Sequence, residues 1–76
     1  MDLKHAFGMT LKRVRKEKGF SQEGLALEAD IGRSYMSDLE RGISEPGLEM
    51  VFRICETLQI KPSEFVRKME RKVKIT

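Results

Sequence analysis

Residues 33–41 hold the side chains whose types and spacing could carry out recognition chemistry. The guanidinium of Arg33 can pair bidentately with O6 and N7 of guanine, and the carboxylate of Asp38 can accept from N4 of cytosine. The hydroxyl of Tyr35 can donate to a phosphate. The alternatives are that Arg33 touches only phosphate, that Tyr35 is a half-buried packing residue, and that Asp38 faces solvent or repels phosphate. The chemistry that these groups share is recognition of nucleic acid.

Catalysis and metal binding have no comparable set of residues. His5 is the single histidine and Cys55 the single cysteine, so neither a disulfide nor a metal-ligand cluster is expected within one chain. There is no glycine-rich phosphate loop after a strand and no nucleophile beside a plausible base. We therefore expect a non-enzyme without cofactor or metal. The single cysteine also fits a reducing, cytoplasmic setting.

Length and composition predict one all-α domain covering residues 1–76. Hydrophobic residues make up 39% of the chain, and two prolines and six glycines divide it into helices joined by short turns. The sequence has no apolar run long enough to cross a membrane and no secretory signal at its start. A soluble, unprocessed protein with no membrane partner is expected.

The net charge of +3 is distributed unevenly. Residues 1–20 and residues 61–76 each carry six basic and two acidic side chains, whereas residues 21–60 carry three basic and eight acidic ones. A long basic groove is therefore not expected, and any contact with DNA must be local. The basic tail is expected to be mainly a solvated face, with contact to DNA as the alternative; it comprises Arg67, Lys68, Arg71, Lys72 and Lys74.

Apolar periodicity and turn residues predict five helices. These are expected to begin at Leu3, Gln22, Arg33, Pro46-Gly47 and Pro62. Gly19 should end the first, the second should end near Ala29, and the third should end near Arg41, before Gly42. Leu39 of the third helix is expected in the core, together with an apolar stripe of the fourth helix formed by Leu48, Val51, Phe52, Cys55 and Leu58.

Three residues, Asp30-Ile31-Gly32, connect the second and third predicted helices. So short a connection forces the two helices to cross steeply, which is typical of the helix-turn-helix motif, whose second helix enters the major groove. Asp30 occupies the position where this turn needs a positive φ, and Asp tolerates that conformation better than most residues.

Several ordered segments carry a resemblance to a known family. They are Ser21-Gln22-Glu23, Leu25-Ala26, Tyr35-Met36-Ser37, Leu39-Glu40-Arg41-Gly42 and Pro46. Together they resemble the phage repressor and Cro-like (XRE-type) helix-turn-helix family, over roughly residues 7–66. The resemblance implies a compact five-helix lambda-repressor-like fold. Within the family, the run Arg33-Ser34-Tyr35-Met36-Ser37 looks like controller proteins of restriction-modification systems.

The resemblance also implies roles for single residues. Base edges would be contacted by Arg33, Ser34, Ser37 and Asp38. The DNA backbone would be contacted by Gln22, Tyr35 and Arg41. Arg15 and Glu40 match a partly buried ion pair between the first helix and the end of the recognition helix, and Ala26 matches a point where two helices approach closely.

Three residues depart from the family pattern. Gly24 stands where a helix-forming Glu is usual, and glycine costs about 1 kcal/mol relative to alanine inside a helix. The second helix should therefore be soft. Asp30 replaces the usual turn glycine, and Gly32 replaces the usual Ser or Thr cap, which removes a capping side chain from the recognition helix.

The fifth predicted helix carries an apolar stripe with little to cover it. Met69, Val73 and Ile75 are expected to form a homodimer interface, with closure of the monomer core by Met69 as the alternative. The leading hypothesis is a regulator that binds a palindromic operator as a homodimer and blocks or recruits RNA polymerase. The rival hypothesis is an antitoxin-like or adaptor module that uses the same fold to bind a protein, and a third is nonspecific nucleoid binding.

Overall fold

The computed structural model describes residues 1–73, and within that range it contains five α-helices and no strand. The helices are α1 (Leu3–Glu17), α2 (Gln22–Glu28), α3 (Arg33–Glu40), α4 (Leu48–Leu58) and α5 (Pro62–Glu70). The expected all-α, five-helix fold is confirmed, with helix ends within a residue or two of the predicted ones. Lys74 and the predicted interface residue Ile75 lie outside the described residues. None of the described helices is long and apolar enough to cross a membrane.

Side-chain caps mark the start of α1 and α2, and a proline marks the start of α5. The hydroxyl of Ser21 accepts from the backbone N–H of Gly24 at 2.9 Å, and the carboxylate of Asp2 accepts from the N–H of His5 at 2.9 Å. Gly32 has no side chain with which to cap α3, as the sequence predicted. Pro62 occupies the start of α5, where a missing N–H costs nothing.

Left-handed backbone residues end or turn the helices. Gly19 and Gly42 have φ of +83° and +75°, and the predicted positive φ of Asp30 is confirmed at 57°. Gln59, at the end of α4, also has a positive φ of 56°, which the sequence analysis did not predict. Asparagine and glycine are more usual there than glutamine, so no sequence signal marked this turn.

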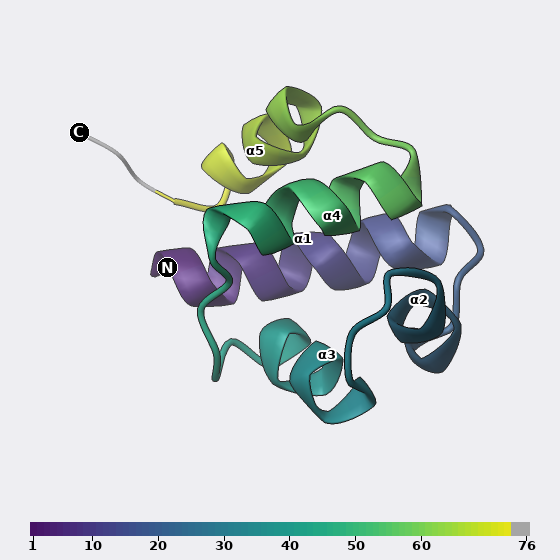
Figure 1. Cartoon of the computed structure of the whole chain (residues 1–76). Helices are drawn as coiled ribbons and strands as arrows, with labels where there is room; N and C mark the ends of the chain where they lie inside the picture. The colour runs from purple at the N-terminus through teal and green to yellow at the C-terminus, as the bar shows by residue number, and fades with distance from the viewer. Residues whose placement is uncertain (74–76) are drawn as a thin grey trace.

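Helix α1 lies at the centre of the molecule and packs against α2, α3 and α5 (Figure 1). In this view α5 lies on the opposite side of α1 from α2 and α3. The rings of Phe7 on α1 and Phe65 on α5 have centroids 5.3 Å apart at an angle of 51°, a favourable tilted arrangement. The core also takes Leu25, Met36 and Leu39 from the helix-turn-helix segment.

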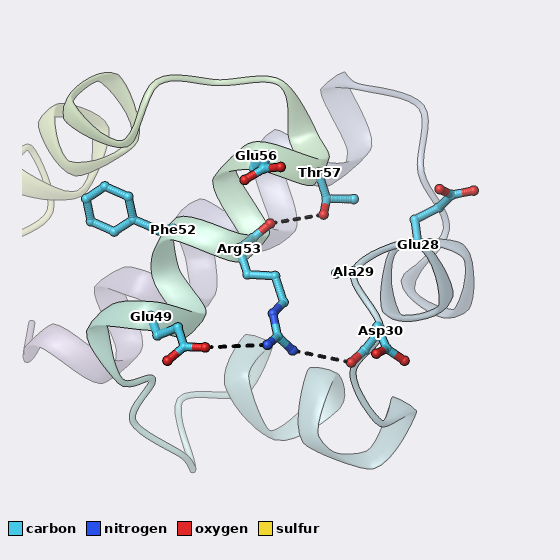
Figure 2. Close-up of a pocket in the computed structure, with 8 residues that line it drawn as sticks. All are labelled: Glu28, Ala29, Asp30, Glu49, Phe52, Arg53, Glu56 and Thr57. Atoms are coloured by element: carbon cyan, nitrogen blue, oxygen red, sulfur yellow. Dashed lines mark hydrogen bonds and ion pairs between the residues drawn. The ribbon is translucent and has the colours of Figure 1, made fainter.

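The expected core stripe of α4 is partly wrong. Phe52 is 53% exposed and Leu48 is 76% exposed, whereas Ile54, absent from the predicted stripe, is fully buried. The buried face of α4 follows Val51, Ile54, Cys55 and Leu58, and Phe52 projects about 100° away from Val51. Figure 2 shows Phe52 pointing away from the helix axis on the rim of an open groove that α4 forms with the end of α2.

Candidate nucleic-acid interface

The turn between α2 and α3 is built from backbone hydrogen bonds and one left-handed residue. The N–H of Ile31 donates to the carbonyl of Ala26 at 2.9 Å, and the N–H of Asp30 donates to that of Leu27 at 3.2 Å. These bonds satisfy the last carbonyls of α2 while Asp30 reverses the chain. Three residues separate Ala29, which caps α2, from Arg33, which begins α3, and a connection of this length is typical of the helix-turn-helix motif.

One open depression gathers most of the residues for which DNA contacts were predicted. It measures about 410 Å³ and is lined by Gln22, Arg33, Ser34, Ser37, Asp38 and Arg41. Helix α2 contributes its first residue and α3 contributes its polar face. Tyr35 does not line the depression, because its half-buried side chain packs against the core. The structure thus brings together six of the seven residues that were predicted to contact DNA. The contact of Tyr35 with the DNA backbone stays a prediction.

Both arginines of this depression are paired with exposed carboxylates. Nη1 of Arg33 lies 3.2 Å from Oε2 of Glu23, and Nη1 of Arg41 lies 4.0 Å from Oδ1 of Asp38. Exposed pairs of this kind are worth under about 1 kcal/mol. Either guanidinium can therefore leave its carboxylate for a phosphate or a base edge at little cost. The role of Glu23 was missed, since no sequence rule links positions ten residues apart across a turn.

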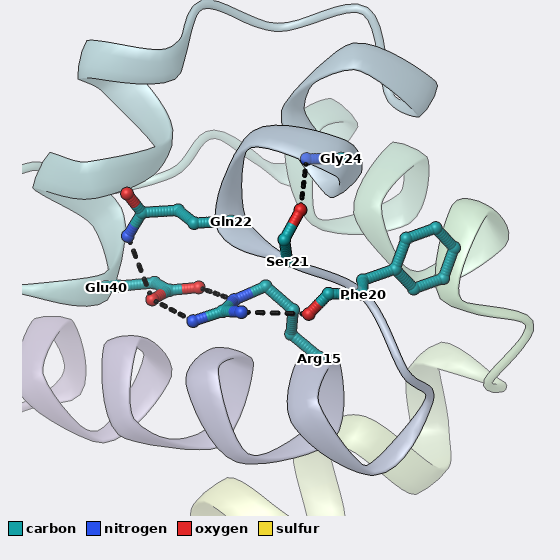
Figure 3. Close-up of polar contacts among 6 residues, drawn as sticks. All are labelled: Arg15, Phe20, Ser21, Gln22, Gly24 and Glu40. Atoms are coloured by element: carbon teal, nitrogen blue, oxygen red, sulfur yellow. Dashed lines mark hydrogen bonds and ion pairs between the residues drawn. The ribbon is translucent and has the colours of Figure 1, made fainter.

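A buried network joins the interface to α1 (Figure 3). Arg15 donates through Nη2 to Oε1 of Glu40 at 3.1 Å, through Nε to the other carboxylate oxygen, and through Nη1 to the carbonyl of Phe20 at 2.9 Å. The side chains of Arg15 and Glu40 are 8% and 3% exposed. This bidentate pair fixes the end of α3 relative to α1 and to the segment before α2.

Gln22 belongs to the same network. Its Nε2 donates to Oε1 of Glu40 at 3.1 Å, so one of its two amide protons is used within the protein. The second amide proton is the donor that remains for a phosphate. Gln22 is the first residue of α2 and lines the depression, and it is held there by the same carboxylate that orients Arg15.

Gly8 is a positioning residue that the sequence analysis missed. A Cβ built on Gly8 would lie 2.5 Å from the carbonyl oxygens of Leu39 and Glu40, so α1 and the last turn of α3 are in backbone contact here. A glycine inside a helix costs about 1 kcal/mol relative to alanine, and this unfavourable choice was the signal available in the sequence. The close approach sets how far α3 stands out from the core.

Metal binding and thiol chemistry are the two other kinds of site considered within residues 1–73. No group of three or more His, Cys, Asp or Glu within residues 1–73 could hold a metal ion. Cys55 is buried, and loss of hydration raises the pKa of its thiol to about 11. Near neutral pH the thiol stays protonated and behaves as a small core residue rather than a nucleophile.

Two short helices joined by a tight turn, with a polar, arginine-bearing second helix, define a DNA-binding protein of the helix-turn-helix class. The sequence profile of the helix-turn-helix family matches residues 11–65, which is most of the chain. The protein belongs to this family, and the resemblance seen in the sequence is confirmed.

The relatives include control proteins. The control protein C.MunI of a Mycoplasma species is 38% identical over 71 residues, covering 92% of this chain and 96% of that protein. The control protein C.BamHI of Bacillus amyloliquefaciens is 36% identical over 61 residues, covering 79% of this chain and 75% of that protein. Among solved structures, the restriction-modification controller protein C.Esp1396I, as a tetramer with its natural 35 base-pair operator, matches with a TM-score of 0.86 and 25% identity, over 95% of each chain.

Proposed function

We propose that this protein is a transcription regulator that binds a palindromic operator as a homodimer and controls restriction-modification genes. The observation that carries the proposal is the depression in which Gln22 and the polar face of α3 come together. The near full-length similarity to a control protein supports the choice of regulated genes. In this proposal residues 1–76 act as one domain, and the bound dimer blocks or recruits RNA polymerase.

The proposed reading of DNA follows from where each side chain lies on α3. Arg33 starts the helix and is 68% exposed, so its guanidinium can reach a guanine in the major groove. Ser34, Ser37 and Asp38 share the same depression and face the bases beside it. Arg41 caps the far end of α3, where a phosphate is the natural partner. Gln22 and Tyr35 add contacts to the sugar-phosphate backbone of the DNA.

Support for the homodimer comes from an apolar groove that no residue of α3 lines. It measures about 210 Å³ and is lined mainly by apolar side chains of α1, α4 and α5, including Leu3, Phe7, Leu48, Val51, Val66 and Met69. Leu48, Leu3 and Val66 are exposed there. A second copy would cover them and place two recognition helices about 34–36 Å apart on one DNA face.

Met69 and Val73 of the originally expected interface are both half-buried. Met69 lines the groove and also packs against the core, which agrees with the alternative that it closes the monomer core and leaves its part in a dimer interface a proposal. The interface proposed from the groove is centred on Leu48 and Val66, whereas the interface expected from the sequence was at the end of α5. An exposed Leu48 at the start of α4, unexplained in a monomer, then becomes an interface residue.

Binding titrations on labelled genomic fragments test this function. We expect a saturable complex at moderate salt whose affinity depends on sequence, and scrambled DNA of the same length should bind more weakly by about 10³-fold or more. Equal affinity for scrambled DNA would indicate nonspecific nucleoid binding instead. Absence of any complex with DNA would favour the antitoxin-like or adaptor module.

A further inference from the structure

A small cavity between α1 and α5 gathers positive charge away from the helix-turn-helix surface. It measures about 50 Å³ and is lined by Thr10, Arg13, Val14, Lys68, Arg71 and Lys72. Four of these six residues are cationic and none is acidic. The basic ends of the sequence, 55 or more residues apart, are thus brought face to face by the packing of α5 on α1.

A buried hydroxyl lies at the same cavity. Thr10 is 1% exposed, and among residues 1–73 its Oγ1 has no hydrogen-bond partner. Buried polar atoms in folded proteins are nearly always paired, so an orphaned hydroxyl beside four cations indicates a missing partner. A hydroxyl both donates and accepts, but an anion is the partner that the surrounding charges favour.

The cavity faces away from α3. Successive residues of an α-helix are about 100° apart around its axis, so Thr10 projects about 200° from Gly8. Gly8 touches the last turn of α3, and Thr10 therefore projects towards the opposite side, where α5 lies (Figure 1). DNA held by α3 does not reach this cavity, and an anion bound here is a separate ligand.

We propose that this cavity binds a single phosphoryl group, as inorganic phosphate or as the phosphate of a small phosphomonoester. A water molecule needs about 10–15 Å³ of such space, so the cavity has room for one tetrahedral oxyanion and not for a larger ligand buried whole. Rotation of the Thr10 side chain about χ1 brings its hydroxyl, which is closed to solvent in the free protein, to one phosphate oxygen, and Arg13, Lys68 and Arg71 donate to the others.

One carboxylate competes with phosphate for Arg13, but the ion pair that it forms is weak. Arg13 lies 3.4 Å from Oε2 of Glu17, but both side chains are exposed, so the pair can open at little cost. No other residue of the cavity has a carboxylate within 4 Å in the described part of the chain. A bound phosphate offsets the repulsion between the cations of α1 and those of α5, and so holds the last turn of α5 on α1.

The experiment is an NMR titration of the ¹⁵N-labelled full chain with inorganic phosphate at constant ionic strength. We expect saturable shifts at the amides around Thr10 and Arg71 and a higher Tm with phosphate than with chloride. Thr10→Val keeps the shape of the side chain and removes an unpaired polar atom, so the variant folds. It should weaken phosphate binding by about tenfold. Lys68→Gln alone should weaken phosphate binding, and Lys68→Gln combined with Arg71→Gln should abolish saturation.

Lys16→Gln is the matched control, because Lys16 lies on α1, is exposed and does not line the cavity. It makes the same change of charge as Lys68→Gln and should leave phosphate affinity within about twofold. Unchanged affinity in Thr10→Val, equal losses in Lys16→Gln and Lys68→Gln, or a titration that never saturates would each overturn the proposal. A parallel titration with glycerol 3-phosphate distinguishes the two possible ligands. If glycerol 3-phosphate binds more tightly, the ligand is a phosphomonoester. If inorganic phosphate binds more tightly, the ligand is the free ion.

Discussion

Arg33 and Arg41 show how two chemically identical side chains acquire different expected roles. Both are exposed, and both are paired with a nearby carboxylate. They differ in position, because Arg33 begins α3 and Arg41 caps its far end. A residue at the start of a recognition helix reaches base edges, whereas one beyond its end lies beside the phosphates.

Arg33→Ala and Arg41→Ala should therefore weaken DNA binding in different ways. Arg33→Ala should lose about 1–3 kcal/mol on the cognate site and much less on scrambled DNA, because a base contact is removed. Arg41→Ala should weaken all sequences about equally and reduce the slope of log affinity against log salt by nearly one unit per half-site. Binding isotherms at several salt concentrations measure both effects.

Arg67→Ala is the control for these two variants, since Arg67 is exposed on α5 and lines neither the depression nor the apolar groove. Arg67→Ala should bind cognate and scrambled DNA with the same affinities as the wild type. If Arg33→Ala reduces cognate and scrambled binding by the same factor, Arg33 is not a base-reading residue.

Glu40→Ala tests the buried network. Removing this carboxylate leaves the guanidinium of Arg15 buried without its partner, and such a loss costs about 3–5 kcal/mol. Glu23→Ala removes a carboxylate from an exposed pair and should cost under about 1 kcal/mol. Urea denaturation measures the free energy of unfolding of each variant, and similar losses in the two would rule out a special role for the network.

At the scale of elements, α4 shows how the orientation of a helix is decided. Its sequence offers apolar residues on more than half of its circumference, from Leu48 to Leu58. Packing against α5 and α2 selects the face with Ile54, Cys55 and Leu58 as the buried one. Leu48 and Phe52 are left on exposed surfaces, one on the apolar groove and one on the groove of Figure 2.

Leu39→Ala and Phe52→Ala should consequently differ in stability. Leu39 is fully buried, and truncating it should lower the free energy of unfolding by about 2–5 kcal/mol. Phe52 is half exposed, so Phe52→Ala should cost under about 1 kcal/mol. Thermal melts of the two variants provide the comparison, and a loss in Phe52→Ala as large as that in Leu39→Ala would contradict the packing of α4.

Gly8→Ala tests the contact between α1 and α3. The new methyl group would press on the carbonyls of Leu39 and Glu40, and overpacking of this kind costs about 1–3 kcal/mol, which outweighs the gain of about 1 kcal/mol in helix propensity. Since the contact is with the backbone of α3, DNA affinity should fall as well. Lys12→Ala, on an exposed position of α1, should change stability by about 0.5 kcal/mol or less. A stabilised Gly8→Ala would contradict the close approach.

For the whole molecule, the surface proposed to bind DNA is separate from two surfaces that α5 forms with α1. The helix-turn-helix depression is on α2 and α3, the apolar groove joins α1, α4 and α5, and the cationic cavity lies between α1 and α5. Self-association through the apolar groove therefore leaves α3 free to bind DNA.

Val66→Glu should disrupt the proposed homodimer, because a carboxylate would be buried in an apolar interface. We expect sedimentation to show a dimer for the wild type at tens of micromolar and a monomer for Val66→Glu, with weaker operator binding. Arg67→Ala should remain dimeric. A wild-type protein that is strictly monomeric, both free and on operator DNA, would contradict the proposal.

The sequence by itself determined the features that depend on neighbouring residues. The cap Ser21, the terminating Gly19 and Gly42, and the left-handed Asp30 act within a few residues, so the five helices and their turn could be predicted from local rules. The order of motif residues on α3 was sufficient to predict its polar face, because helical periodicity places them together.

Only the tertiary structure decided which surfaces meet. It buried Ile54 in place of Phe52, placed Gly8 against the backbone of α3, and paired Arg33 with Glu23. It also turned the basic residues of the two chain ends towards one cavity. Each of these outcomes depends on where a second helix lies in space, and contacts between residues far apart in the chain are set by the packing of the whole core rather than by local sequence.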